Sequence, residues 1–220
     1  MPPAAERVCI VHDGGLPALV ACLMAEDPEQ VVAWRPPLGV AWGEGTITEV
    51  HAAAVQQQVE LLSLGRLIEA PVLASNEDER RGGQGLEVST LLLAAARDAL
   101  AERCTRLIWP VCCGSDLDAL YDAAERATLL TRLIQLDLEE AGREMPVGGR
   151  MLRVEVPLAD LTSLQVAELA LDLDAPTHVC WWRLPGVENV AGGMTTRTEW
   201  AGALDAAARA MGFPFAPVAA

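Results

Sequence analysis

The sequence lacks the long apolar segments and the basic leader that direct chains into membranes or out of the cell. No segment stays apolar for the roughly 20 residues that a membrane-spanning helix needs. Residues 1–7 lack the basic end and the apolar run of a signal peptide. We therefore expect a cytoplasmic protein with no membrane partner.

The six cysteines lack the spacing of a disulfide framework or a zinc-binding motif. Cys112 and Cys113 are adjacent, but no pair has the two-residue spacing that zinc sites commonly use. Cys9 and Cys22 lie within apolar segments that predict buried elements. Zinc is therefore not expected as a cofactor.

A basic excess is also missing, because the formal net charge is −15 and the 16 basic residues are scattered. This charge repels phosphate backbones, which argues against a long nucleic acid as partner. We expect a small molecule or a protein as partner. The apolar share of 51% would also suit a homodimer interface, whose position composition does not give.

Residues 1–220 contain no low-complexity stretch or charge block, which predicts one domain, with a core to about residue 176 and a helical extension over about 177–220. The predicted strands are Arg7–Val11, Val31–Trp34, Leu67–Leu73, Leu107–Trp109 and Met151–Val156. The predicted helices are Leu16–Met24, Thr46–Leu64, Leu91–Leu100, Asp118–Glu140, Ser163–Leu173 and Thr195–Met211. A polar surface loop is expected over Ser75–Gly85. This alternation predicts an α/β, Rossmann-like fold with a five-stranded parallel sheet and helices on both faces.

The first strand ends at His12-Asp13-Gly14-Gly15, and a helix with Pro17 in its first turn follows at once. In an open parallel sheet, ligands bind beyond the carboxyl ends of the strands, where the strand order reverses. We therefore expect this loop, Trp34 and the segment 112–122 to surround one crevice.

Several segments in chain order resemble the PP-loop ATP pyrophosphatases, and among these the 7-cyano-7-deazaguanine synthases. Residues 12–18 resemble a changed version of their Ser-Gly-Gly-x-Asp-Ser loop, and His51 matches a histidine that opens the family's second helix. Asp116 and Asp122 keep the spacing of two family aspartates, and Pro157-Leu158 with the following helix matches without a gap. Cys180 before an aromatic residue resembles the first zinc cysteine.

The resemblance implies an ATP-binding loop made of His12, Asp13, Gly14, Gly15, Leu16 and Ala18, with Trp34 nearby. It implies ATP and Mg²⁺ as cofactors, and His51, Cys112, Asp116 and Asp122 as substrate-pocket candidates. The family's reaction adenylates a carboxylate and replaces AMP with ammonia, ending in a nitrile.

Residues that would carry out this chemistry differ from the family. Asp13 replaces the first loop serine, Pro17 the aspartate and Ala18 the second serine. Further differences are Ser163 in place of a lysine, Ala123-Ala124 in place of Cys-Arg, and Ala191, Met194 and Arg197 at later zinc-cysteine positions. Each lost donor removes about 1.5–3 kcal/mol of binding to a charged group. Asp13 at ~4 Å from a phosphate would add about 4 kcal/mol of repulsion unless Mg²⁺ bridges them.

Our first hypothesis is therefore a PP-loop-like pseudoenzyme that binds a nucleotide, another ligand or a partner without catalysis. The second is a divergent ATP-dependent ligase or amidating enzyme that uses His12, Asp13, Asp116 or Asp122 with Mg²⁺. The third, tRNA modification as in other PP-loop proteins, is disfavoured by the acidic charge.

Each candidate residue also has a structural interpretation. Asp13 would cap the first helix, and His12 and His51 would be hydrogen-bonded structural histidines. Cys112 and Cys113 would be unreactive and would pack as small apolar side chains. The acids Asp116, Asp118 and Asp122 would be solvated residues at a helix start, and Trp181, Trp182 and Trp200 would pack the C-terminal region.

Overall fold

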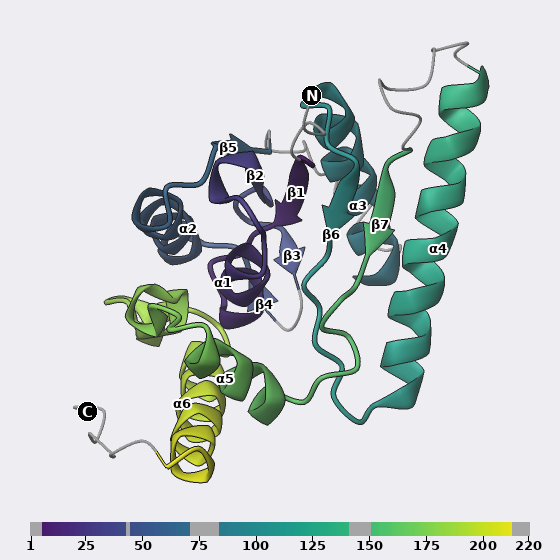
Figure 1. Ribbon diagram of the computed structural model, residues 1–220. Coiled ribbons are helices and arrows are strands. Elements are labelled where there is room, and N and C mark those ends of the chain that lie inside the picture. The colour runs from purple at the N-terminus through teal and green to yellow at the C-terminus, as the bar shows by residue number, and fades with distance from the viewer. Residues whose placement is uncertain (1–5, 43–44, 71–83, 141–150, 213–220) are drawn as a thin grey trace.

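The sheet confirms the predicted α/β class. The computed structural model describes residues 6–42, 45–70, 84–140 and 151–212. Five parallel strands form the main sheet in the order β5-β2-β1-β6-β7 (Figure 1). Their bounds are β1 Val8–Val11, β2 Val31–Arg35, β5 Arg66–Glu69, β6 Arg106–Ile108 and β7 Arg153–Glu155.

The central strand β1 pairs with a parallel strand on each side and is buried on both faces. Val8 pairs with Val31 of β2 on one side and with Arg106 of β6 on the other. All four β1 residues are buried, since helices cover both faces of the sheet. The chain builds outward from β1 through β2 to β5 and then returns to add β6 and β7, so the strand order reverses beside β1.

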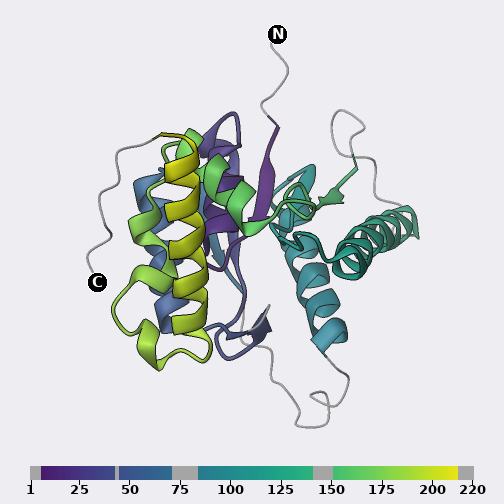
Figure 2. The ribbon, with the colours of Figure 1, turned by 90° about the horizontal axis from the view of Figure 1, so that it is seen from below.

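Helices cover the two faces in separate groups, as Figure 2 shows. The helices on one face are α1 Leu16–Leu23, α2 Glu49–Leu61, α5 Ser163–Asp172 and α6 Gly193–Ala210, and those on the other are α3 Gln84–Ala101 and α4 Leu117–Glu140. Short 3-10 helices are η1 Pro28–Gln30, η3 Thr177–Val179, η4 Trp181–Arg183 and η5 Val187–Asn189. No helix in the described part of the chain is long and apolar enough to cross a membrane.

The core follows the alternation of side chains along the strands. Cys9 and Val11 of β1 pack against the α3 and α4 side, whereas Val8 and Ile10 pack against the α1 side. A third cluster joins α1, α5 and α6 through residues such as Trp182, which is 1% exposed. This cluster fastens the C-terminal helices to the beginning of the chain.

Several element boundaries differ from the sequence prediction. The helix expected from Thr46 begins at Glu49, because Gly45–Thr46 (β4) pairs with Ala41–Trp42 (β3) in a small antiparallel sheet. The backbone N–H of Thr48 donates to His51 Nδ1, at 3.2 Å, which fixes this helix start.

The helix expected from Leu91 begins at Gln84, so the end of the predicted loop Ser75–Gly85 is helical; its residues 75–83 lie outside the described part. The strand expected to reach Leu73 ends at Glu69 among the described residues, which stop at residue 70. Leu133, predicted on the apolar side of α4, is 41% exposed.

Candidate functional site

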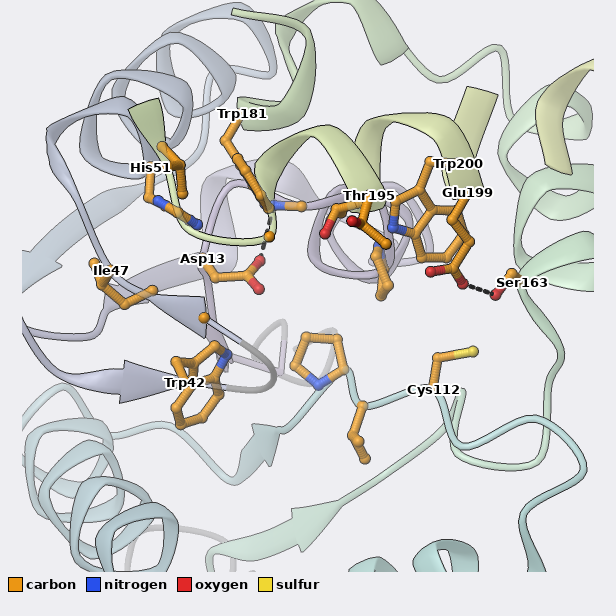
Figure 3. A pocket seen from close by; sticks show the side chains of 18 of the residues that line it. Asp13, Trp42, Ile47, His51, Cys112, Ser163, Trp181, Thr195, Glu199 and Trp200 are labelled. Carbon is orange, nitrogen blue, oxygen red and sulfur yellow. Dashed lines mark hydrogen bonds between the residues drawn. The ribbon is translucent and has the colours of Figure 1, made fainter. Parts of the chain in front are cut away.

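A cavity lies at the carboxyl ends of β1 and β6, where the strand order reverses. It has a volume of about 630 Å³, within the range of small-molecule sites. Its walls come from the β1–α1 loop, the β3–β4 hairpin, the segment after β6, η4 and the start of α6 (Figure 3). Of the residues that the sequence analysis placed around the crevice, Asp13, Gly15 and Cys112 line this cavity.

Gly14 shapes the β1–α1 loop because no other residue fits its position. Its φ is +79°, and a Cβ added there would lie 2.8 Å from Ala54 Cβ of α2. The Gly14 carbonyl accepts from Gln58 Nε2 at 2.9 Å and from the Trp181 N–H at 3.0 Å. Gln58 also donates to the Val179 carbonyl at 3.0 Å. The loop is thus held against α2 and the η3–η4 segment.

Two amide donors of this loop, those of Gly14 and Gly15, are hydrogen-bonded within the loop itself. The Gly14 N–H donates to His12 Nδ1 at 3.1 Å, and the Gly15 N–H donates to Asp13 Oδ1 at 2.8 Å. Gly15 is the N-cap of α1, and no side chain caps the helix from that position. The expected capping role of Asp13 was therefore wrong: Gly15 is the N-cap, and the Asp13 carboxylate accepts from the Gly15 amide within the turn that precedes the helix.

Burial sets the charge states of the loop histidine and carboxylate. Burial lowers the pKa of His12 from 6.5 to about 4, so the ring is neutral near pH 7. Because Nδ1 accepts from Gly14, the proton of the neutral ring is on Nε2. Burial also raises the pKa of Asp13, against the opposing effect of the Gly15 hydrogen bond.

His51 combines a structural role with a place at the cavity wall. Its Nδ1 accepts from the Thr48 N–H, and its ring stacks on Trp181 with 4.2 Å between centroids. Burial lowers the pKa of His51 to about 4. His51 therefore faces the cavity as a neutral ring that fixes the position of Trp181.

The cysteine candidates are not activated thiols. Cys112 lines the cavity, but its Sγ donates to the Leu161 carbonyl at 2.8 Å, and burial raises the pKa of its thiol. Burial likewise raises the pKa of Cys113, and Cys180 is fully buried in the core. A raised thiol pKa keeps the reactive thiolate scarce near neutral pH.

Several predicted site residues lie away from the cavity. Trp34 is fully buried on the α3 side and donates from Nε1 to Asp98 Oδ2 at 2.9 Å. The side chains of Leu16 and Ala18 are also fully buried, so only their backbone is near the loop. The placement of Trp34 at the crevice was wrong, since its side chain points into the core between sheet and helix.

The two predicted aspartates are likewise outside this cavity. Asp116 is exposed and accepts from the Ala119 N–H at 3.0 Å at the start of α4. Asp122 is exposed on α4, where it borders a separate, smaller pocket with Leu129. Their interpretation as solvated residues at a helix start agrees with these positions.

Four tryptophans line the cavity, and sequence reasoning assigned none of them to it. They come from β3, the segment after β6, η4 and α6, and are Trp42, Trp109, Trp181 and Trp200. Trp181 and Trp200 also pack in the C-terminal core cluster, as expected. No periodic pattern links the four, because they lie on short elements far apart in sequence.

The charged groups at the cavity are mainly acidic. The Asp13 carboxylate and the Glu199 carboxylate of α6 both line it, and Glu199 Oε1 accepts from the Ser163 hydroxyl at 2.7 Å (Figure 3). Among the described lining residues, Arg126 is the one arginine, and it donates to the Ser89 hydroxyl. The whole sequence contains no lysine, since all 16 basic residues are arginines.

Within the described ranges, no three His, Cys, Asp or Glu side chains are grouped so that they could hold a metal ion. No protein-family model and no curated protein matches the sequence. A search of solved structures finds similarity to the U34-tRNA thiolase NcsA from Methanococcus maripaludis with its 4Fe-4S cluster. The two chains are 18% identical, the match covers 96% of this chain and 74% of that one, and the TM-score is 0.46.

Proposed function

We propose that this protein is a non-catalytic relative of the PP-loop ATP pyrophosphatases that binds a small ligand at the end of its sheet. The resemblance to the 7-cyano-7-deazaguanine synthases suggests the line of descent, and the changed loop suggests that ATP turnover has been lost. A protein partner that uses the bound ligand is compatible with this role.

One observation carries the proposal: the two loop amides that would hold a pyrophosphate already have acceptors within the loop. A PP-loop binds phosphate by pointing free N–H groups at it from a helix N-terminus. Here Gly14 donates to His12 and Gly15 donates to Asp13. A phosphate at Gly15 would have to displace the Asp13 carboxylate from its hydrogen bond.

The residues around the loop do not fit a triphosphate. Displacing Asp13 gives up a charge-assisted hydrogen bond worth about 1.5–3 kcal/mol. The carboxylate would then lie near the phosphate, with about 4 kcal/mol of repulsion at ~4 Å. The sequence has no lysine to offset this charge, and Arg126, which keeps its positive charge while donating to Ser89, is the one arginine among the described residues that line the cavity. The two effects of Asp13 act in the same direction, against ATP, and one guanidinium opposes them.

Gly14 of the loop has a structural role that does not require phosphate. Gly14 lets the β1–α1 turn pass close to Ala54 and accept from Gln58 and Trp181. These contacts join the loop to the segment that carries the cavity's aromatic wall. The loop thus supports the shape of a ligand site, which is consistent with a binding function.

Calorimetry with ATP and Mg²⁺, run beside a pyrophosphate-release assay on small carboxylates, tests the proposal. We expect no binding tighter than about 1 mM, an affinity of only about 4 kcal/mol, and no pyrophosphate release. Tighter binding that disappears in Gly15→Asp but persists in Gly202→Asp would overturn it. Gly202 is a suitable control because, like Gly15, it has no positive φ, nothing lies within 4 Å of its added Cβ, and it does not line the cavity. Pyrophosphate release with the same pattern would instead support the divergent ligase.

A further inference from the structure

The aromatic walls of the cavity suggest the shape of its ligand. Four of the six tryptophans line one cavity, and the other two, Trp34 and Trp182, are buried in the core. Trp181 and Trp200 are 8% and 9% exposed, so they are packed in place. Indole faces bind flat rings by stacking and attract cations through their π electrons. The walls therefore favour a flat ligand.

The carboxylates suggest the charge of that ligand. Figure 3 shows the side chains of Asp13 and Glu199 directed into the same cavity from the β1–α1 loop and from α6. Each has one oxygen hydrogen-bonded within the protein, to the Gly15 N–H and to the Ser163 hydroxyl. A carboxylate has about four acceptor sites, so each of these two can also accept from a ligand. Two such acceptors favour a ligand with cationic N–H donors.

The basic groups near the cavity do not reverse this preference. Arg126 keeps its positive charge while it donates to the Ser89 hydroxyl, so one guanidinium stands against two carboxylates, and burial keeps the His51 ring neutral. The formal net charge of −15 adds a long-range field of the same sign as the two carboxylates. An anionic ligand would be repelled by the two carboxylates at short range and by the net negative charge of the protein at long range.

We propose that the cavity binds a small, flat organic cation without phosphate, such as an aromatic amidine, guanidine or protonated amino-heterocycle. This inference rests on the proposed ligand-binding function and specifies its ligand class. The ring lies against the tryptophan walls, and the cationic N–H groups donate to Asp13 and Glu199. His51 acts as a positioning residue, because its stacking fixes Trp181.

Three probes of the same size and different charge test the proposal: benzamidine, a cation; benzamide, which is neutral; and benzoate, an anion. Each is titrated into the full-length protein, with quenching of tryptophan fluorescence and calorimetry as readouts. We expect saturable binding of benzamidine, at least tenfold weaker binding of benzamide, and none of benzoate. This difference in affinity is the size expected when the cation, unlike the neutral amide, makes charge-assisted hydrogen bonds to the carboxylates.

Two charge-removing variants and a matched control locate the site. Asp13→Asn and Glu199→Gln should each weaken benzamidine binding about tenfold or more. Glu188→Gln makes the same charge change at an exposed η5 residue that does not line the cavity, so affinity should stay within twofold. Glu199 is exposed, so its variant remains informative if Asp13→Asn fails to fold.

Three outcomes would overturn the proposal: benzoate binding as tightly as benzamidine, no saturable benzamidine binding up to its solubility limit, or equal affinity in all three variants. The ATP titration keeps this failure separate from that of the proposed function. Absent benzamidine binding together with absent ATP binding would reject the ligand class alone. Tight ATP binding at Gly15 would reject the proposed function itself.

Discussion

The buried histidines should make the folded protein unusually sensitive to acid. His12 is fully buried, and its pKa is about 4 in the folded protein against 6.5 for an ordinary histidine. The unfolded chain therefore binds a proton near pH 6.5, whereas the folded chain binds it only near pH 4. Stability from the neutral ring is fully present above pH 6.5 and is lost as the pH falls toward 4.

The size of this effect follows from the pKa difference. Each pKa unit corresponds to about 1.4 kcal/mol, so lowering the pH from 6.5 to 4 should remove about 3 kcal/mol through His12. His51, whose pKa is also about 4, should act in the same direction and with similar size. Acidic groups also change the free energy of unfolding between pH 6.5 and 4. The contribution of one histidine is therefore measured as the difference between the wild type and a variant that lacks it.

Urea unfolding of the wild type and His12→Asn, followed by tryptophan fluorescence at several pH values, isolates the contribution of His12. An asparagine Oδ1 can take the place of Nδ1 as acceptor for the Gly14 N–H but does not titrate. Between pH 6.5 and 4 the wild type should lose about 3 kcal/mol more than the variant. His178→Asn, at an exposed histidine, is the control. Parallel loss in wild type and His12→Asn would refute the reasoning.

Two further substitutions test how the loop and core are built. Gly14→Ala should destabilise the fold by about 2–3 kcal/mol, because its φ is +79° and its Cβ would meet Ala54 at 2.8 Å. Gly39→Ala, with the same φ and open space, should lose only about 1 kcal/mol, and equal losses in urea unfolding would contradict the steric argument. Trp34→Phe should lose about 1.5–3 kcal/mol by leaving Asp98 without its indole donor; unchanged stability would show that this hydrogen bond is unimportant.

The sequence predicted the scaffold because strong local patterns determine it. Val8–Val11 and Val31–Arg35 are short apolar runs that become strands buried on both faces. The N-terminal end of α5 was predicted at Ser163, where Thr162 and Gln165 form a capping box. Alternation of such segments was enough to predict the parallel sheet and the position of the crevice.

The composition of the site could not be predicted because it depends on contacts between distant segments. Trp42 is in a two-residue strand, too short for any periodic signal, and Trp181 is in a single 3-10 turn. The bond from the Gly15 amide to Asp13 depends on the path of the backbone through Gly14, which spacing alone does not specify. Trp34 was misplaced because a strand residue points to one face or the other, and its indole packs toward α3.

NMR of the loop amides during addition of ATP and Mg²⁺ tests the central claim most directly. If His12 and Asp13 occupy the donors of Gly14 and Gly15, the resonances of these two glycine amides should stay in place throughout the titration. Large, saturable shifts confined to these two amides and the following helix start would show that phosphate reaches the donors, and would contradict the account.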